Sequence, residues 1–406
     1  MSEPIRIIHF ADLHIGMENY GRMDPETGLN GRVADFLVRL DDVVTYAHEH
    51  DADLVLFAGD AFRSRSPGTT LQREFAQRIR RLSDAGIAVV LLVGNHDVPV
   101  MSQRASSVEI FDTLAVPHVT VAQKPAVHRI NTKRGPLQVL ALPYPIRQRL
   151  LSRDQFRSLP QEQLDRAVSE ALVGILDSLA ASLDPECPSV VLGHFSVDGA
   201  LWGSERSIMV GRDVTLPVSA LNDARWQYVA LGHIHQHQDL NPGSAPPIVY
   251  SGSLERVDFG EERQPKGFCW VLLDQHKASW RYVEVPARRF VTVRADVRGE
   301  PDPLEVVERA AASVELAGAV VRLIVRMAPE QEPGLRDVDV MPLLASAFFA
   351  QVNREIDRAV RDRLDGVEPA AMTDVHLLER YLTQTGRDEA AAAPYLAAAV
   401  GIFTEA

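Results

Sequence analysis

Short apolar runs recur along the chain, and glycine or polar residues bound each of them. The first three runs lie at residues 5–11, 53–58 and 88–93. Their length and their bounding residues predict buried strands. Between them, residues 30–48 and 71–82 carry apolar side chains at helical spacing. An alternation of strand, helix and strand predicts a parallel sheet, so the chain begins as an α/β protein.

A second series of apolar runs adds further strands. We expect strands at residues 118–122, 137–142, 189–192, 226–231, 248–250, 267–274 and 279–285, with helices at 108–114 and 164–179. The last three strands are expected to close a second sheet. Two sheets with helices on their outer faces would bury the apolar side of every element. Residues 1–287 are therefore predicted to form a four-layer α/β/β/α sandwich.

The last third of the chain has a different pattern. Residues 290–297 and 320–327 are strand-like, and Asp302 is suited to start a helix between them. We therefore expect a small α/β domain at residues 288–334, ending in a polar linker that contains proline.

From Met341 onward the pattern is helical, so residues 335–406 are predicted to be a helical tail. Thr373 can cap one helix, which Gly386 would end. A last, alanine-rich helix carries an apolar stripe of Leu396, Val400 and Phe403. Amphipathic helices without a sheet beside them need a partner surface. The pattern alone leaves open whether that surface belongs to this chain or to another protein.

Composition and charge narrow the class of protein. With 406 residues, of which 46% are hydrophobic, the chain can bury a large core. The net charge of −13 argues against a general electrostatic surface for nucleic acid, so a phosphate partner would need metal ions or local basic patches. Two cysteines without a C-x-x-C spacing favour a reducing compartment. No apolar run approaches ~18 residues and the first residues lack a signal-peptide pattern, so we expect a cytoplasmic protein without a membrane segment.

Polar motifs directly follow five of the predicted strands. They are D-x-H, G-D, G-N-H-D, G-H and G-H-x-H, and they supply Asp12, His14, Asp60, Asn95, His96, Asp97, His194, His233 and His235. Loops beyond strand ends are held by a rigid scaffold, so these side chains can converge. Mixed carboxylate, amide and imidazole ligands suit Mn²⁺, Fe²⁺ or Zn²⁺ better than Ca²⁺. Two such ions about 3.5–4 Å apart can hold both a water and a phosphoryl oxygen, which favours phosphoester hydrolysis.

The other eight histidines lack this context. We expect His9, His48, His50, His118, His128, His276 and His376 to be ordinary core or surface residues. His237 continues the alternation after His235 and is expected to lie on the surface or just behind a metal ligand.

These motifs resemble those of the calcineurin-like metallophosphoesterase superfamily, and more closely those of its SbcD nuclease-subunit family. The closer resemblance rests on the run from Tyr250 to Glu262, followed by Lys266-Gly267-Phe268. It also rests on Asp97, because protein phosphatases of the superfamily usually carry glutamate at this position. The resemblance covers nearly the whole chain and is looser after Val285.

The resemblance implies a role for each site residue. One metal ion would be held by Asp12, His14, Asp60 and His235, and the other by Asp60, Asn95, His194 and His233. Asp60 would bridge the two divalent ions, and Mn²⁺ is the expected metal. His96 would stabilise the transition state or protonate the leaving oxygen, with Asp97 orienting its imidazole.

The resemblance also implies a function. It is that of a metal-dependent DNA nuclease, a double-strand exonuclease and single-strand endonuclease that works by a two-metal mechanism. Such a protein would act as a homodimer in DNA repair, recombination and replication, with residues 102–114 as a candidate dimer surface. Its small domain would cap the site and help to recognise DNA, and its helical tail would bind an SbcC-type ATPase. Two alternatives remain, a phosphodiesterase of small substrates such as cyclic nucleotides and a non-catalytic scaffold for the ATPase.

One position departs from the family pattern. Archaeal and eukaryotic members commonly carry a histidine three residues after the bridging aspartate, whereas this chain has Arg63. One interpretation is that bacterial members simply vary there. The other is that Arg63 contacts a backbone phosphate and shifts the balance between exonuclease and endonuclease action.

Overall fold

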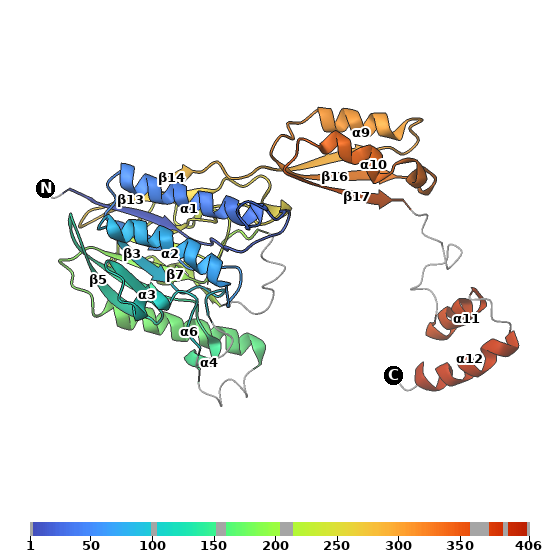
Figure 1. Ribbon diagram of the computed structural model, residues 1–406. Coiled ribbons are helices and arrows are strands. Elements are labelled where there is room, and N and C mark those ends of the chain that lie inside the picture. The colour runs from blue at the N-terminus through green and yellow to red at the C-terminus, as the bar shows by residue number, and fades with distance from the viewer. Residues whose placement is uncertain are drawn as a thin grey trace.

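The fold has two main parts, a four-layer sandwich and a small α/β unit (Figure 1). The computed structural model describes residues 3–98, 104–151, 160–203, 214–357, 373–384 and 389–403. Two six-stranded sheets lie face to face in the sandwich, and helices cover their outer faces. This arrangement confirms the predicted α/β/β/α fold class.

The first sheet has the strand order β14-β13-β1-β2-β3-β4. The strands are β1 (Ile5–Phe10), β2 (Leu54–Phe57), β3 (Ala88–Leu92), β4 (Val119–Ala122), β13 (Gly267–Leu273) and β14 (Ala278–Glu284). Strands β1 to β4 run parallel to their neighbours, whereas β13 pairs antiparallel with β1 and with β14. The prediction that residues 267–274 and 279–285 belong to the second sheet is therefore wrong. Both strands extend the first sheet beyond β1.

The second sheet has the strand order β11-β12-β10-β7-β6-β5. The strands are β5 (Ala126–Thr132), β6 (Gly135–Leu142), β7 (Ser189–His194), β10 (Tyr228–Gly232), β11 (Gln238–Asp239) and β12 (Ile248–Tyr250). Strands β6, β7, β10 and β12 are parallel, and short antiparallel strands lie at both edges. Residues 248–250 lie in the second sheet, as predicted.

Three apolar cores hold the layers together because successive side chains of a strand point to opposite faces. Ile8 and Phe10 of β1 face the helices α1 (Gly31–Glu49) and α2 (Thr69–Asp84). Ile7 of β1 faces the second sheet. The outer face of that sheet is covered by α6 (Gln161–Ala180). Every central strand is thus buried on both faces, which explains its nearly continuous apolar sequence.

Short elements complete the sandwich. They are α3 (Ile110–Thr113), α4 (Arg147–Leu150), α8 (Val218–Leu221), the 3₁₀ helix η1 (Phe259–Glu261), and the paired strands β8 (Ser196–Val197) and β9 (Thr215–Leu216). The structure confirms the predicted start of α1, because the Asn30 side chain accepts a hydrogen bond from the backbone N–H of Arg32 at 2.9 Å.

The small unit is a three-stranded parallel sheet with helices beside it. Its elements are β15 (Phe290–Asp296), α9 (Pro303–Ala312), β16 (Val320–Met327), η2 (Pro329–Gly334), α10 (Asp337–Val340), η3 (Met341–Leu344) and β17 (Phe349–Ile356). Strand β17 pairs along its whole length with β16. The prediction of a helical chain from Met341 onward is therefore wrong at these residues, and the predicted boundary after residue 334 cuts through this sheet. The alternating pattern of β17 is weak because only one of its ladder edges is paired.

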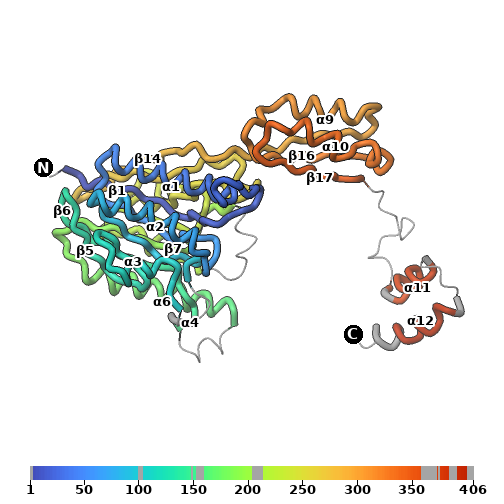
Figure 2. The backbone as a smooth tube through the Cα atoms, in the orientation of Figure 1, coloured from blue at the N-terminus to red at the C-terminus, as the bar shows by residue number. Residues whose placement is uncertain are grey.

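An aromatic cluster joins the small unit to the sandwich. Phe259 of η1 lies 5.0 Å from Phe290 of β15, measured between ring centroids, and Tyr20 lies 5.6 Å from Phe290. Arg288 forms a bidentate ion pair with Asp35 of α1. In Figure 2 the chain leaves β14 and enters the small unit beside the loop that precedes α1. These contacts fix the small unit against one end of the sandwich.

Two helices, α11 (Asp374–Gln384) and α12 (Glu389–Phe403), pack against each other near the C-terminus. The backbone N–H of His376 donates to the hydroxyl of Thr373, which confirms Thr373 as the predicted cap. Gly386, the predicted end of the first helix, lies outside the described residues. Within the part of the chain that the structure describes, none of the helices combines the length and the apolar character that crossing a membrane requires.

Candidate metal centre

Five strand ends, from both sheets of the sandwich, meet at one place. The ends of β1, β2 and β3 carry Asp12, His14, Asp60 and Asn95, and the ends of β7 and β10 carry His194, His233 and His235. These strands are parallel within each sheet, so their carboxyl ends share an edge. All seven residues are buried, with at most 8% of their surface exposed. The structure therefore brings together every metal ligand that the sequence predicts.

The first half of the centre contains Asp12, His14, Asp60 and His235. The Nε2 atoms of His14 and His235 are 3.0 Å apart, and His14 Nε2 is 3.8 Å from Asp60 Oδ2. Asp12, His14 and His235 can each offer one donor atom within 4.8 Å of the others. Burial and the neighbouring His235 hold the pKa of His14 well below its usual value, so its imidazole is neutral and has a lone pair to offer.

The second half contains Asn95, His194 and His233, again with Asp60. Asn95 Oδ1 lies 2.9 Å from His194 Nε2 and 3.0 Å from His233 Nδ1. His194 Nε2 is 3.5 Å from Asp60 Oδ2. Asp60 therefore stands between the two halves, within reach of donors on both sides. Burial alone would raise the pKa of Asp60. The nearby His194 and His96 lower this pKa by more than burial raises it, so the carboxylate is ionised.

Four of these residues have an unusual backbone. Asp12, His14, Asp60 and His233 have φ angles of 54°, 45°, 63° and 97°. Positive φ angles are sterically costly for residues with a Cβ atom, by roughly 1–3 kcal/mol each, and they cluster at functional sites. Among the described residues, these four make up half of the eight non-glycine residues with positive φ. The packing of the surrounding fold therefore offsets the strain of these four residues, whose side chains meet at the site.

Two glycines allow the loops of the site to approach closely. A Cβ atom on Gly94 would lie 2.2 Å from Oδ1 of Asp60. A Cβ atom on Gly59 would lie 2.5 Å from Nδ1 of His194, and Gly59 also has a φ of +96°. Glycine is therefore required at the positions directly before Asp60 and Asn95.

Asp97 holds two of the ligand-bearing loops together. Its Oδ2 atom accepts hydrogen bonds from the backbone N–H groups of Asp60, at 2.8 Å, and of Gly94, at 3.0 Å. Ser107 donates its hydroxyl to Oδ1 at 2.8 Å. Burial and the adjacent Asp60 raise the pKa of Asp97 to about 6. The expected contact between Asp97 and the His96 imidazole is wrong, because the described hydrogen bonds of this carboxylate go to these groups and to the backbone N–H of Ala61, at 3.2 Å.

His96 stands at the edge of the centre and is half-buried. Its Nδ1 atom lies 2.7 Å from the backbone carbonyl of Arg63, and its ring lies 4.8 Å from that of His14. The carbonyl can only accept, so Nδ1 carries the proton and Nε2 is the lone-pair nitrogen of the neutral ring. Arg63 thus orients His96 through its main chain, while its side chain is exposed to solvent.

Two buried charged residues of the site were missed by the sequence reasoning. Glu261 Oε1 lies 2.7 Å from Nδ1 of His235, and Lys266 Nζ lies 2.7 Å from the other oxygen of Glu261. Both residues stand in or beside the run that carries the family resemblance. Neither follows a strand end, so the motif pattern assigned them no role.

Two histidines outside the centre have other partners. His237 stacks on Tyr282 with ring centroids 3.9 Å apart and contacts the backbone carbonyl of Tyr250. It is half-buried behind His235, close to its predicted position on the surface or just behind a metal ligand. His9 is fully buried between the sheets and contacts Tyr228 and the carbonyl of Leu231.

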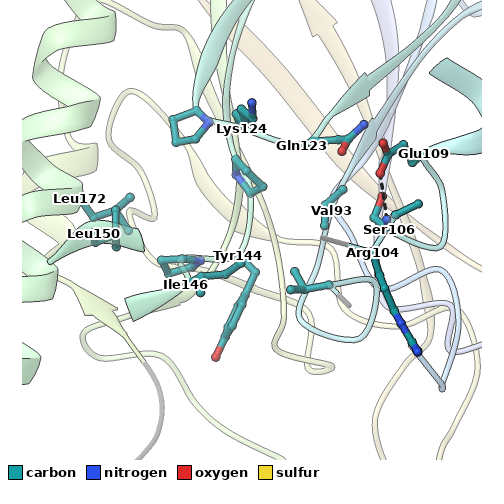
Figure 3. Close-up of a pocket in the computed structure, with 15 residues that line it drawn as sticks. Val93, Arg104, Ser106, Glu109, Gln123, Lys124, Tyr144, Ile146, Leu150 and Leu172 are labelled. Carbon is teal, nitrogen blue, oxygen red and sulfur yellow. Dashed lines mark hydrogen bonds between the residues drawn. The ribbon is translucent and has the colours of Figure 1, made fainter. Parts of the chain in front are cut away.

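Figure 3 shows the residues that line a cavity of about 500 Å³. Tyr144 lines it, and the Tyr144 ring lies 5.9 Å from that of His233. Val93, which directly precedes the Gly94-Asn95 motif, forms another part of the wall. Two exposed basic side chains, Arg104 and Lys124, line the cavity as well. The carboxylate of Glu109 lines the cavity too, so its wall carries two cations and one anion.

The donor set fits divalent transition-metal ions. Two imidazole nitrogens at 3.0 Å with a carboxylate beside them form a cluster of lone pairs that a cation stabilises. An ionised aspartate lies between this cluster and a second one of imidazole and amide donors. Fold and site together define the class of metallophosphoesterases.

Comparison with known proteins gives the family. The model of the calcineurin-like phosphoesterases matches residues 5–237, more than half of the chain. The chain belongs to this family, and it is a metal-dependent phosphoester hydrolase.

The named relatives are subunits of the nuclease SbcCD and a DNA double-strand break repair protein. The chain is 28% identical to the SbcD subunit of the nuclease SbcCD from Bacillus subtilis, over 69% of this chain and 69% of that protein. It is 31% identical to the SbcD protein of Rhodobacter capsulatus, over 63% of this chain and 65% of that protein. It is also 28% identical to the DNA double-strand break repair protein Mre11 of Haloferax volcanii, over 87% of this chain and 68% of that protein. The chain thus spans about two thirds of the length of these relatives.

Proposed function

We propose that this protein is a nuclease that hydrolyses phosphodiester bonds of DNA at a centre of two Mn²⁺ ions, as an SbcD-type subunit. The observation that carries the proposal is the convergence of six buried donor residues around a seventh, the ionised Asp60. Relatives named as the SbcD subunit of the nuclease SbcCD and as Mre11 support DNA as the substrate.

The residues divide between two ions. Asp12, His14, Asp60 and His235 would hold one ion, and Asp60, Asn95, His194 and His233 the other. Bound ions would supply charge neutralisation at the scissile phosphate and a water of lowered pKa. Imidazole and amide donors beside carboxylates are the mixed set that Mn²⁺ accepts.

His96 is proposed to act on the substrate itself. It is half-buried at the mouth of the centre, and Arg63 fixes its ring through a backbone carbonyl. Its free Nε2 atom can take up a proton and then donate it to the leaving oxygen, or it can stabilise charge on the phosphate. Asp97 would act on position only, by holding the Asp60 and Gly94 loops.

Local basic groups compensate for the acidic chain. Arg63 and Arg65 follow the Asp60 loop and are exposed, and Arg104 and Lys124 line the neighbouring cavity. Four cations around one centre can contact backbone phosphates on either side of the scissile bond. We propose Arg63 as one of these contacts, with an effect on the balance between exonuclease and endonuclease action.

An ATPase partner and a second copy complete the proposal. The helix pair α11–α12 carries the exposed aromatic side chains Tyr381 and Tyr395, which suit a partner helix. The SbcD relatives are named as subunits of the nuclease SbcCD, so we propose that this pair binds an SbcC-type ATPase. Ile110 and Leu114, which are also exposed, lie within the candidate dimer surface at residues 102–114.

The test is digestion by the purified chain with Mn²⁺. The substrates are a labelled linear duplex, a circular single strand and a generic phosphodiester dye. We expect cleavage of both DNA substrates, and its loss in Asp60→Ala and His96→Ala. Dye hydrolysis without DNA cleavage, even with the ATPase partner added, would contradict a nuclease and favour a small-substrate phosphodiesterase.

A further inference from the structure

A buried ion pair lies directly behind one metal ligand. Glu261 has no exposed surface, and its Oε1 atom is 2.7 Å from Nδ1 of His235. Its Oε2 atom is 2.7 Å from Nζ of Lys266 and accepts the backbone N–H of Val257 at 3.0 Å. Lys266 also donates to the backbone carbonyl of His235, at 3.2 Å. Carboxylate and ammonium therefore hold both the ring and the main chain of His235.

This geometry selects one tautomer of His235. A carboxylate only accepts hydrogen bonds, so Nδ1 of His235 must carry the proton. The lone pair is then on Nε2, the atom that faces Nε2 of His14 and lies in the cluster with Asp12. A histidine that binds a metal commonly donates its other N–H to such a group, which fixes the ring and makes the ligand more basic.

The same segment also holds the small unit. We call residues 251–266 the strap. The carboxylate of Glu262, next to Glu261, accepts hydrogen bonds from Thr292 of β15 through its backbone N–H and its hydroxyl. Arg256 donates to the backbone carbonyls of Glu261, at 3.2 Å, and of Arg288, at 2.9 Å. One turn of η1 thus touches a metal ligand on one side and the small unit on the other.

We propose that Glu261 is the positioning residue of His235, and that through it the strap sets the affinity of the ion held by Asp12, His14, Asp60 and His235. The inference rests on the metal centre of the proposed function and deepens it. The other ion, at Asn95, His194 and His233, does not depend on Glu261, because the described contacts of Glu261 lie on the His235 side only.

The most direct variant is Glu261→Gln. Its amide oxygen would take the place of Oε2, because Lys266 and the Val257 N–H both donate there. The amide NH₂ group would then face Nδ1 of His235 and donate to it. The proton of His235 would move to Nε2, the nitrogen that must bind the ion. We expect the affinity for one of two Mn²⁺ ions to fall by about 10–100-fold.

Glu255→Gln is the matched control. Glu255 lies in the same strap and is as deeply buried, with 1% of its surface exposed. Its partners are Arg32 and the backbone N–H groups of Arg256 and Arg288, none of which is a metal ligand. We expect both Mn²⁺ affinities of Glu255→Gln to match those of the wild type.

The measurement is calorimetric titration of the metal-free chain with Mn²⁺ alone, together with ¹⁵N spectra of labelled histidine. The spectra should show His235 protonated at Nδ1 in the wild type and at Nε2 in Glu261→Gln. Unchanged affinities in Glu261→Gln, or an equal loss in Glu255→Gln, would overturn the inference. If Glu261→Gln does not fold, Glu261→Gln with Lys266→Met removes both charges and keeps the Val257 N–H that orients the amide, so the same loss is expected.

The titration contains no DNA, so it separates the two proposals. One weakened site in Glu261→Gln supports the inference whether or not the wild type cuts DNA. Wild-type DNA cleavage combined with unchanged Mn²⁺ affinities in Glu261→Gln would overturn the inference and leave the nuclease proposal intact. A wild type that binds no Mn²⁺ would overturn both.

Discussion

His9 links the two sheets of the sandwich through a single side chain. It belongs to β1 of the first sheet, and its ring nitrogens contact the hydroxyl of Tyr228, at 3.1 Å, and the carbonyl of Leu231, at 3.2 Å, in β10 of the second. The carbonyl can only accept, so Nε2 carries the proton and Nδ1 accepts from Tyr228. Burial lowers the pKa of His9 to about 3, and the folded protein therefore holds this histidine neutral.

This burial predicts a pH dependence of stability. The pKa of His9 is about 3 in the folded chain and about 6.5 in the unfolded chain. As pH falls below 6.5, the unfolded state binds a proton that the folded state does not, so stability is lost between pH 6.5 and 3. The contribution amounts to about 2 kcal/mol between pH 7 and pH 5.

Between pH 7 and pH 5, we expect the free energy of unfolding of His9→Gln to fall by about 2 kcal/mol less than that of the wild type. Urea unfolding of the metal-free chain measures this difference. His276→Gln, at an exposed position, should keep the wild-type pH dependence. Equal pH dependence in all three proteins would contradict a neutral His9.

Single residues also show what a sequence can reveal about a site. Asp12, His14 and Asp60 were predictable because each directly follows an apolar strand, which is a local pattern. The contacts of Asp97 and Glu261 were not predictable, since the partners of Asp97 include residues 37 positions away and His235 lies 26 positions before Glu261. Only the folded chain shows which buried carboxylate faces which neighbour.

At the scale of elements, edge and antiparallel strands were the least predictable. The helices α1, α2 and α6 and the central strands were predicted from their periodicity and apolar character. The periodicity of β13 and β14 identified them as strands but not their sheet, because β13 pairs with β1 across more than 250 residues of sequence. Strand β17 was missed because its half-exposed side chains do not alternate clearly.

The contact between the sandwich and the small unit predicts a second effect. Arg288 pairs with Asp35 through two nitrogens, and its guanidinium lies 3.7 Å from the ring centroid of Phe348. Arg288→Ala should lower the free energy of unfolding of the small unit by roughly 1–3 kcal/mol, since charged hydrogen bonds and a cation–π contact are lost. Hydrogen exchange of the β15 and β16 amides measures this.

The neighbouring Arg289→Ala is the control for that experiment. Arg289 is exposed, and the described hydrogen bond of its side chain goes to the carbonyl of Ala317 at 3.2 Å. Its exchange rates should stay close to those of the wild type. If both variants accelerate exchange equally, Arg288 does not fix the small unit.

At the scale of the whole molecule, the chain carries a net charge of −13, whereas the proposed substrate, DNA, is a polyanion. Overall charge opposes their association, so local cations have to provide the attraction. Arg104 and Lys124 are placed for it because they line the cavity beside the metal centre (Figure 3). DNA binding should then depend on few phosphate contacts and on the metal ions.

Salt dependence measures these contacts. For the double variant Arg104→Gln with Lys124→Gln, we expect weaker duplex binding and a slope of log affinity against log salt that is smaller by about 1–2. Binding can be followed by fluorescence anisotropy. Arg309→Gln, at an exposed position on α9, is the control and should leave the slope unchanged. An unchanged slope in the double variant would show that DNA does not follow this cavity.

The hydrogen bonds by which Asp97 links two loops of the site have a kinetic consequence. Its carboxylate accepts hydrogen bonds from the backbone N–H groups of Asp60 and Gly94 and from the hydroxyl of Ser107. These hydrogen bonds form within the protein and do not require a bound ion. The loops are thus held by the protein itself. Loading should resemble the filling of a rigid receptor, with a rate governed by how fast an arriving ion sheds its hydration shell. Chelation should then empty the centre reversibly and leave the fold in place for reloading.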